Sequence, residues 1–368
     1  MKSLPHRPSL EFLKKQAKQL RAQHRERAPQ FCDHIRQFDT SYQTQADDAI
    51  FNHAFSINDA QRIVAREYGF ASWTKLKRYI EAVTGKKSYG VSDRKAYHKT
   101  ITDSYDERSK NYYWSKWHRD IAHRLVDYHP PKTGQHVLDI ATGTGTIPFH
   151  CARLIGPQGS AIGVDISTGM INKANAFLKG SQFRNLSFMV ADGEHLEFSA
   201  NTFDRIYCAN AFFWMEDHLA ALKHWHTMSR VGGIVGFTAW PDSSFIWGSL
   251  AQRVLDKYGI YYALNRPTAS EERCAEIMQL AGFENIDIRV VEDGDFITLE
   301  AAKGGWLQED HYAPAQYPHP LTGVDPDILK QAEADYDAEL EKMNTDKGIW
   351  NDLTMYYIYG TKPDVTGS

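Results

Sequence analysis

A short apolar segment that ends in an acid and runs into a glycine-containing turn restricts the fold of this chain more than any other feature. The segment is VLDIATGTG, residues 137–145. An apolar run of this kind predicts a buried strand, and the glycines predict a turn whose backbone adopts positive φ or approaches a ligand closely. Ligands of α/β sheets bind outside the carboxyl ends of the strands. We therefore expect a ligand site at this turn.

Apolar runs alternate with helical stretches along the rest of the chain after about residue 96. Short apolar runs that predict strands occupy residues 136–140, 161–166, 186–191, 205–209, 233–240, 285–291 and 355–360. Such alternation is typical of a parallel sheet with helices on both faces. The sequence therefore predicts an α/β fold with a seven-stranded, doubly wound, mostly parallel sheet of Rossmann-like type.

Residues 1–84 follow a different pattern and predict a small all-α domain. Apolar residues recur every three to four positions in residues 9–28, as on one face of a helix. Residues 56–83 predict two helices separated at a glycine. The first of them begins with Ser56 and Asp59, which have the spacing of a capping box.

The polar stretch 85–95 predicts a linker to a second domain, residues 96–368. The two parts differ in charge: residues 1–88 contain 16 Lys and Arg against 9 Asp and Glu, a net +7, whereas the remainder contains 26 against 37, a net −11. A basic helical domain permits nucleic-acid binding. Its positive residues are spread throughout, however, so packing, dimerisation or covering the substrate is the preferred role.

Composition and cysteine usage place the chain in a reducing compartment. No apolar run of about 18 residues exists, so no transmembrane helix is expected, and the start, MKSLPHRPSLEFLKK, has no apolar stretch of signal-peptide type. The four cysteines are scattered without a CxxC pair, and no HExxH motif occurs. Neither a disulfide framework nor a metal site is therefore expected. These features predict a cytoplasmic protein.

Two kinds of cofactor compete for the turn. A dinucleotide site requires the pattern GxGxxG; Gly143 and Gly145 satisfy its first two glycines, but the third position is Pro148. Asp139 lies at the end of the strand, where a carboxylate suits a ligand with a cationic amine better than a diphosphate. S-adenosylmethionine carries such an amine.

Polar residues after the next strands agree with this interpretation. Asp165 ends the second predicted strand, where a carboxylate can accept hydrogen bonds from both hydroxyls of a ribose. Asp192 follows the third, where it can accept a bond from an adenine amino group, and Gly193 lets the chain pass close to the ligand. Asn210 follows the fourth.

Residues 136–240 resemble the class I S-adenosylmethionine-dependent methyltransferases, closest to the ubiquinone/menaquinone-biosynthesis type. The matching pieces, in order, are VLDIATGTG, GVDIS, VADGEHLEF, FDRIYCANAF and SRVGG. The first glycine of the family's usual GxGxG loop is Ala141 here. The resemblance implies S-adenosylmethionine as cofactor, S-adenosylhomocysteine as product, and cofactor contacts from Tyr113, Asp139, Ala141, Thr142, Gly143, Gly145, Thr146, Asp165, Ile166, Met170, Ala191, Asp192, Gly193 and Asn210.

The N-terminal segment carries a second resemblance. The pieces LPHRPSLEFLKKQAK and DAQRIVAREYGFASWTKLKRYI are similar to a small helical module at the front of some bacterial ankyrin-repeat and methyltransferase proteins. This likeness implies no particular function.

Methyl transfer requires that the acceptor be held in line with the methyl and that water be excluded. Three segments are expected to surround the methyl: a lid helix at 97–128, the end of the fourth strand at 210–214, and an insertion at 296–352 that caps the acceptor pocket. Aromatic faces attract cations such as the sulfonium and suit an apolar or aromatic acceptor. The expected substrate-pocket residues are Trp114, Trp117, Phe213, Trp214, Trp306 and Tyr312.

A base is needed only where the acceptor loses a proton. The candidates for this role are Tyr105, His118, His218 and His311. The leading hypothesis is methylation of C, O or N on a small, apolar or aromatic metabolite. One alternative is an RNA or protein methyltransferase that docks through the basic domain; the net charge of −11 on the catalytic region and the absence of an Asn-Pro-Pro-aromatic signature disfavour it. The other alternative is a protein that binds the cofactor without catalysis.

Overall fold

The computed structural model describes residues 9–68, 70, 72–74, 76–77, 80, 91–111, 116–260, 262, 268–307, 321 and 323–364. The chain divides into two compact units. One comprises residues 1–86 with 252–262, and the other comprises residues 87–251 with 263–368. The grouping of residues 252–262 with the N-terminal segment is not suggested by any sequence pattern.

Helices account for the regular structure of the described N-terminal segment. They are α1 (Leu10–Arg25), α2 (Phe31–Phe38), η1 (Thr40–Tyr42), α3 (Asp47–Asn52) and α4 (Ile57–Glu67). The predicted capping box is present, because Ser56 Oγ accepts the Asp59 N–H at 3.1 Å and the Asp59 carboxylate accepts the Ser56 N–H at 2.9 Å. Leu13, Phe31 and Ile63 belong to the buried apolar core of these helices. Gly69 lies outside the described residues.

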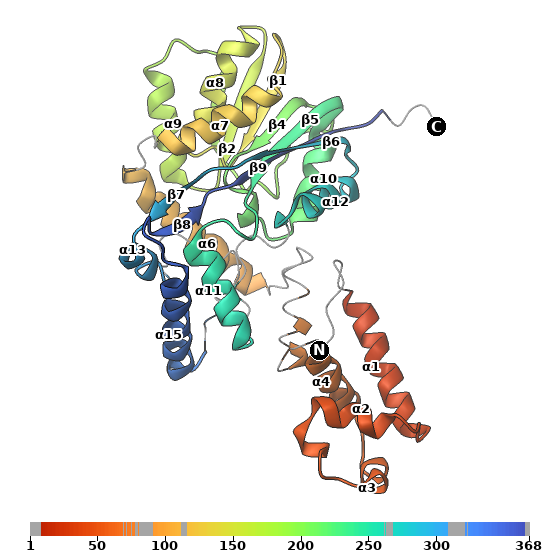
Figure 1. Ribbon diagram of the computed structural model, residues 1–368. Coiled ribbons are helices and arrows are strands. Elements are labelled where there is room, and N and C mark those ends of the chain that lie inside the picture. Colours follow the sequence, from red (N-terminus) through yellow and green to blue (C-terminus); the bar gives the residue numbers. More distant parts are fainter. Residues whose placement is uncertain are drawn as a thin grey trace. The chain divides into compact units, whose positions relative to one another are not determined.

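Seven strands in the described part of the larger unit form one sheet (Figure 1). Its order is β3-β2-β1-β4-β5-β9-β6. The first five strands of the chain pair in parallel, and β9 pairs antiparallel with both of its neighbours. This confirms the predicted fold class. The strands are β1 (His136–Ile140), β2 (Ser160–Asp165), β3 (Leu186–Val190), β4 (Phe203–Cys208), β5 (Ser229–Ala239), β6 (Glu284–Val291) and β9 (Met355–Thr361).

Helices cover both faces of this sheet, as a doubly wound fold requires. Leu125, Ile155 and Ala174 belong to the apolar core on one face, whereas Trp225 and Met278 belong to the core on the other. The first core is covered by α7 (Lys116–Tyr128), α8 (Thr146–Ile155) and α9 (Thr168–Lys179). The second is covered by α10 (His218–Met228) and α12 (Glu271–Leu280).

The remaining elements lie at the edge where the site forms or in the insertion before β9. Helix α6 begins inside the segment predicted as a linker, and α6 and α7 together occupy the span predicted as a single lid helix. The insertion contains a small antiparallel sheet of β7 and β8. None of the described helices is both long and apolar enough to cross a membrane. These elements are α6 (Val91–Asn111), η2 (Phe212–Trp214), α11 (Ile246–Lys257), β7 (Gly294–Ile297), α13 (Leu299–Lys303), α15 (Pro326–Met343) and β8 (Ile349–Asp352).

Candidate active site

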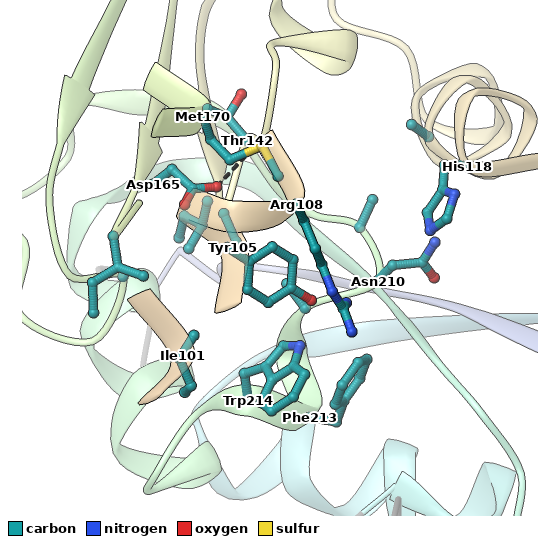
Figure 2. Close-up of a pocket in the computed structure, with 18 of the residues that line it drawn as sticks. Ile101, Tyr105, Arg108, His118, Thr142, Asp165, Met170, Asn210, Phe213 and Trp214 are labelled. Atoms are coloured by element: carbon teal, nitrogen blue, oxygen red, sulfur yellow. Dashed lines mark hydrogen bonds between the residues drawn. The ribbon is translucent and has the colours of Figure 1, made fainter. Parts of the chain in front are cut away.

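A large cavity opens at the carboxyl ends of β1, β2, β3 and β4, beneath α6 (Figure 2). Its volume is about 1420 Å³. Pockets for a single small ligand usually measure about 300–1,000 Å³, so this cavity has room for a cofactor and a second molecule. Polar residues from the strand ends and aromatic residues from the helices and loops line different parts of it.

The turn after β1 holds its backbone in the left-handed region. Ala141, Gly143 and Gly145 have φ values of +55°, +54° and +93°. A Cβ at Gly145 would lie 2.7 Å from the Phe188 ring, so a larger residue does not fit there, whereas a Cβ at Gly143 would meet no protein atom within 4 Å. The turn therefore leaves open space beside Gly143.

Asp139 is buried at the end of β1 and is tied to this turn. Its carboxylate accepts a hydrogen bond from Thr142 Oγ1 at 2.6 Å. Burial raises the pKa of Asp139 well above its usual value, and this hydrogen bond opposes the rise only in part. A bound cation would favour the ionised carboxylate, so the site suits a positively charged ligand group.

Asp165 is anchored by two backbone N–H groups, one from the turn after β1 and one from the turn after β2. One of its carboxylate oxygens accepts the Gly143 N–H at 2.8 Å, and the other accepts the Ser167 N–H at 2.9 Å. Burial raises its pKa from 3.8 to about 6, although these two hydrogen bonds oppose the rise. Its position is therefore fixed before any ligand binds.

Asp192 follows β3 at a close approach of the chain to the sheet. A Cβ at Gly193 would lie 2.6 Å from Ile140 Cγ2, so only glycine fits this position without movement. The Asp192 carboxylate accepts the Glu194 N–H at 2.9 Å and lies 2.8 Å from His195 Nδ1. This arrangement holds the acid at the edge of the cavity.

Helix α6 covers the cavity and is attached to the fold at two places. Asp106 Oδ1 accepts hydrogen bonds from Ser167 Oγ at 2.5 Å and from the Gly169 N–H at 2.8 Å, at the start of α9. Near the end of α6, the Ser109 carbonyl accepts a bond from Lys173 Nζ at 2.8 Å. At the other attachment, the Tyr97 hydroxyl donates to the Trp214 carbonyl at 2.8 Å.

Tyr105 and Trp214 meet inside the cavity below α6. Their rings are perpendicular, with centroids 6.0 Å apart, and burial raises the pKa of Tyr105. The Arg108 guanidinium carbon lies 5.1 Å from the centre of the Tyr105 ring. Its side chain extends past Tyr105 toward Phe213 and Asn210 (Figure 2).

An aromatic wall lies on the side of α7 and β5. The rings of Trp117 and Trp240 stack with centroids 5.5 Å apart and planes 12° apart. Phe245 meets Trp240 edge-on at 4.5 Å, and Trp247 lies 5.6 Å from Phe245. All four line the cavity. We call these four residues the aromatic wall.

His118 lines the cavity next to Trp117 on α7. Burial lowers its pKa, and the nearby Arg108 guanidinium lowers it further, which favours a neutral imidazole that can accept a proton. Asn210 has a φ of +52°, and its N–H donates to Thr238 Oγ1 at 2.8 Å. This left-handed conformation holds the end of β4 beside the cavity.

Most of the predicted site residues that the structure describes line this cavity. Three of them, His218, Trp306 and Gly145, do not. The His218 side chain is buried against Phe212, with ring centroids 4.9 Å apart, and Trp306 packs on Tyr336. His218 is therefore not a base for this cavity, and Trp306 does not form its wall. Those that line it are Tyr105, His118, Asp139, Ala141, Thr142, Gly143, Thr146, Asp165, Ile166, Met170, Ala191, Asp192, Gly193, Asn210, Trp117, Phe213 and Trp214.

Gly145, at the start of α8, does not line the cavity either, because it packs on the Phe188 ring. Four predicted residues lie outside the described part of the chain: Tyr113, Trp114, His311 and Tyr312.

Sequence reasoning missed several residues of the cavity. Arg108 lies on α6 three residues after Tyr105, and this spacing was the available signal. Asp106 does not line the cavity, but it anchors α6 to the start of α9. Trp240 directly follows β5 and is the last residue of the apolar run 233–240. The others come from chain positions far apart in sequence: Tyr97, His98, Arg119, Phe245, Trp247 and Asn351.

His98, Glu194 and Glu216 come together at one side of the cavity. Their potential ligand atoms all lie within 4.8 Å of one another. His98 Nε2 lies 2.8 Å from Glu216 Oε1, and both oxygens of Glu194 accept backbone N–H groups at the start of α10. These contacts tie α6 to the segment before α10 and account for the cluster as a structural one. The absence of a metal stays a prediction.

Comparisons with known proteins agree with this geometry. Residues 137–233 match the protein family described as a methyltransferase domain. The chain is 34% identical over 146 residues to aklanonic acid methyltransferase DauC of Streptomyces sp. (strain C5), a match that covers 39% of this chain and 66% of that protein. The chain carries a class I methyltransferase domain.

Two further similar proteins match the chain less well than DauC does, one over a smaller share of its length and the other at lower identity. Ubiquinone/menaquinone biosynthesis C-methyltransferase UbiE of Coxiella burnetii is 35% identical over 121 residues, with 33% of this chain and 47% of that protein covered. The solved structure of phosphoethanolamine N-methyltransferase 2 of Haemonchus contortus is 20% identical, with a TM-score of 0.42 and coverage of 68% and 53%. The chain thus spans 66% of the length of DauC and about half of the length of UbiE.

The cavity of the methyltransferase domain fits S-adenosylmethionine, the cofactor of this class. Three carboxylates, from Asp139, Asp165 and Asp192, follow three adjacent strands and line one half of the cavity. Gly143, which has open space beside it, lies in the turn after Asp139 and donates its N–H to Asp165. When bound, the cofactor supplies a methyl group on a sulfonium. The aromatic rings of Tyr105 and Trp214 provide faces that stabilise such a cation.

Proposed function

We propose that this protein transfers a methyl group from S-adenosylmethionine to a small, apolar or aromatic metabolite. One observation carries the proposal: a single cavity has carboxylates at the ends of three strands and, beyond them, the aromatic wall of Trp117, Trp240, Phe245 and Trp247. Its size exceeds what one ligand requires. A cofactor above β1 to β3 leaves the space over β4 and β5 for the acceptor.

The strand-end residues have distinct roles in this proposal. Asp165 accepts hydrogen bonds from the ribose hydroxyls, Asp139 with Thr142 faces the cationic amino-acid end, and Asp192 faces the adenine amino group. Ile166 and Met170 line the cavity beside Asp165 and pack on the adenine. Each contact matches a polar or apolar group of the ligand to one side chain of the protein.

The relatives support a small acceptor. The name of DauC describes a methyltransferase for aklanonic acid, and UbiE is named for ubiquinone and menaquinone biosynthesis. Helix α6 and its attachments at Asp106 and Tyr97 exclude water from the methyl. His118 is the base of choice where the acceptor must lose a proton, because it lines the cavity and its pKa is lowered.

The organisation of the chain belongs to the same proposal. Residues 1–84 form the helical domain with a role in packing or dimerisation, and residues 96–368 form the methyltransferase domain. All four cysteines are buried free thiols, which is consistent with the reducing cytoplasm. The chain acts on a small molecule rather than on nucleic acid.

Titration with S-adenosylhomocysteine by isothermal calorimetry tests the cofactor assignment. The wild type is expected to bind, and Asp165→Ala is expected to bind at least ten times more weakly while keeping the thermal unfolding of the wild type within a few degrees. Asp204→Ala is the matched control, because Asp204 lies on β4 away from the cavity and pairs with Arg230. Turnover of labelled S-adenosylmethionine with a panel of aromatic acceptors tests the reaction. Binding without turnover of any acceptor favours the non-catalytic alternative.

A further inference from the structure

The cavity is divided by charge as well as by polarity. The carboxylates of Asp139, Asp165, Asp192 and Glu194 follow β1, β2 and β3. The guanidinium groups that line the cavity, those of Arg108 and Arg119, come from α6 and α7. The carboxylate half matches a cationic cofactor. The half that contains the arginines is therefore left for the acceptor.

Other lining charges do not cancel this division. Glu107, on α6, also lines the cavity, but it is exposed and forms an ion pair with Lys110. His98 lies beside Glu216 and therefore belongs to the carboxylate half. Among the described residues, Arg119 forms no ion pair closer than 4.0 Å; the Asp120 carboxylate interacts with its charge from a greater distance.

The cationic half coincides with the aromatic wall. Arg119 and Trp117, both on α7, line the cavity, and Arg108 projects from α6 toward Phe213 and Asn210 (Figure 2). The rings of Trp117 and Trp240 already stack on each other at 5.5 Å, so a third flat ring would pack against the cavity-lining side of the wall rather than between them. Both arginines line the same cavity as the aromatic wall.

We propose that the acceptor is a planar aromatic anion whose carboxylate is held by the guanidinium groups of Arg108 and Arg119 while its rings pack on the aromatic wall. This inference rests on the proposed function and deepens it by naming the charge of the substrate. Guanidinium groups bind carboxylates through paired, charge-assisted hydrogen bonds. Two such groups in the same cavity as an aromatic wall would select an acid over its neutral analogue.

The charge division has a further consequence for the order of binding. A cofactor bound to the carboxylate half brings a positive charge to the boundary between the two halves. That charge attracts an anionic acceptor and repels a cationic one. The sulfur of the product S-adenosylhomocysteine carries no charge. The anion is therefore expected to bind more tightly to the complex with S-adenosylmethionine than to the complex with S-adenosylhomocysteine.

A matched pair of probes tests the inference: 2-naphthoate and its neutral counterpart 2-naphthamide, titrated into protein saturated with S-adenosylhomocysteine. We expect the acid to bind at least ten times more tightly than the amide at 0.15 M salt. Arg108→Gln and Arg119→Gln are each expected to reduce this preference severalfold, and the double variant is expected to abolish it. Arg108→Lys keeps a positive charge and is expected to retain part of the preference.

Lys116→Gln is the control, because it removes one positive charge from the same end of α7 but Lys116 is exposed and pairs with Asp120. It is expected to leave the preference unchanged. Equal affinity for the two probes, no binding of either probe, or a preference that survives the double variant would overturn the inference. Binding of S-adenosylhomocysteine is measured first in every variant. Failure at that step contradicts the proposed function itself, whereas intact cofactor binding without an acid preference contradicts only the acceptor assignment.

Discussion

The Asp106 carboxylate on α6 accepts the backbone N–H of Gly169, at the start of α9, across 2.8 Å. The same oxygen accepts the hydroxyl of Ser167, the residue that caps α9. An anion at this place is favoured by the positive end of the helix dipole. Since Ser167 also donates its N–H to Asp165, the helix that covers the cavity and the residue assigned to the ribose share one anchor.

Asp106→Asn should loosen this anchor. An amide lacks the negative charge, so it gives a weaker contact to the start of α9 and a more open α6. We expect the affinity for S-adenosylhomocysteine to fall about three- to thirtyfold, since hydrogen bonds to a charged group contribute about 1.5–3 kcal/mol at most and an amide keeps part of that. Calorimetric titration measures this. Asp103→Asn is the control on the same helix, because Asp103 is exposed and pairs only with Lys99 among the described residues; a matching loss in the control would contradict the anchor.

Asp165 should give the protein a characteristic dependence on pH. Its pKa is raised from 3.8 to about 6 by burial, so the folded state holds this proton more tightly than the unfolded state. The resulting stability is fully present below about pH 4 and is lost as the pH rises through about 6, a total of roughly 2–3 kcal/mol. Without ligand, the free energy of unfolding should fall less over this range in Asp165→Asn than in the wild type, as urea titrations at several pH values would measure.

The same ionisation should control cofactor affinity in the opposite direction. The carboxylate accepts hydroxyl hydrogen bonds better than the protonated acid, so binding of S-adenosylhomocysteine should tighten as the pH rises from 5 to 7 in the wild type. The Asp165→Asn variant should bind weakly with a flatter profile. A wild-type affinity that does not change across this range would argue against an ionised Asp165 in the complex.

The strands and the strand-end residues were predictable because they depend on local sequence. Val137 and Leu138 are wholly buried in β1, as an apolar run predicts, and Asp165 ends β2 where the pattern placed it. Arg119 carried no such signal. Its place at the cavity depends on how α7 packs on the sheet, and no local pattern specifies that packing.

The errors at His218 and Trp306 have a similar origin. Both are residues of suitable chemistry in segments near the site, and the direction of a side chain on a helix decides its role. His218 is the first residue of α10 and points into the core against Phe212. Position in sequence could not separate that orientation from one that faces the cavity.

Ala141→Gly should stabilise the protein slightly. Ala141 has a φ of +55°, in the left-handed region that costs an L-residue about 1–2 kcal/mol. Glycine removes that cost but gains about 0.4–1 kcal/mol of backbone entropy in the unfolded state, which leaves a net gain of about 0.5 kcal/mol. Thermal or urea unfolding measures it. Ala152→Gly, in the middle of α8, should instead destabilise by about 1 kcal/mol; equal effects at both positions would show that Ala141 is not strained.

Gly143 and Gly145 should respond differently to alanine, although both have positive φ and lie two residues apart. At Gly145 the added Cβ would lie 2.7 Å from the Phe188 ring, so Gly145→Ala adds overpacking of about 1–3 kcal/mol to the backbone strain. At Gly143 the Cβ meets no protein atom within 4 Å and only the backbone strain remains. We therefore expect Gly145→Ala to lower the unfolding temperature more than Gly143→Ala does.

Ligand binding should reverse that ranking. The Cβ at Gly143 would occupy the open space beside the turn that we assign to S-adenosylmethionine, so Gly143→Ala should weaken binding of S-adenosylhomocysteine at least tenfold in protein that is still folded. Gly180→Ala serves as the reference for both measurements, because Gly180 ends α9 with a φ of −82° and its Cβ would lie 3.6 Å from the nearest atom, the Phe177 carbonyl oxygen. If Gly143→Ala bound the ligand as tightly as this reference, the cofactor would have to approach the sheet by another side of the turn.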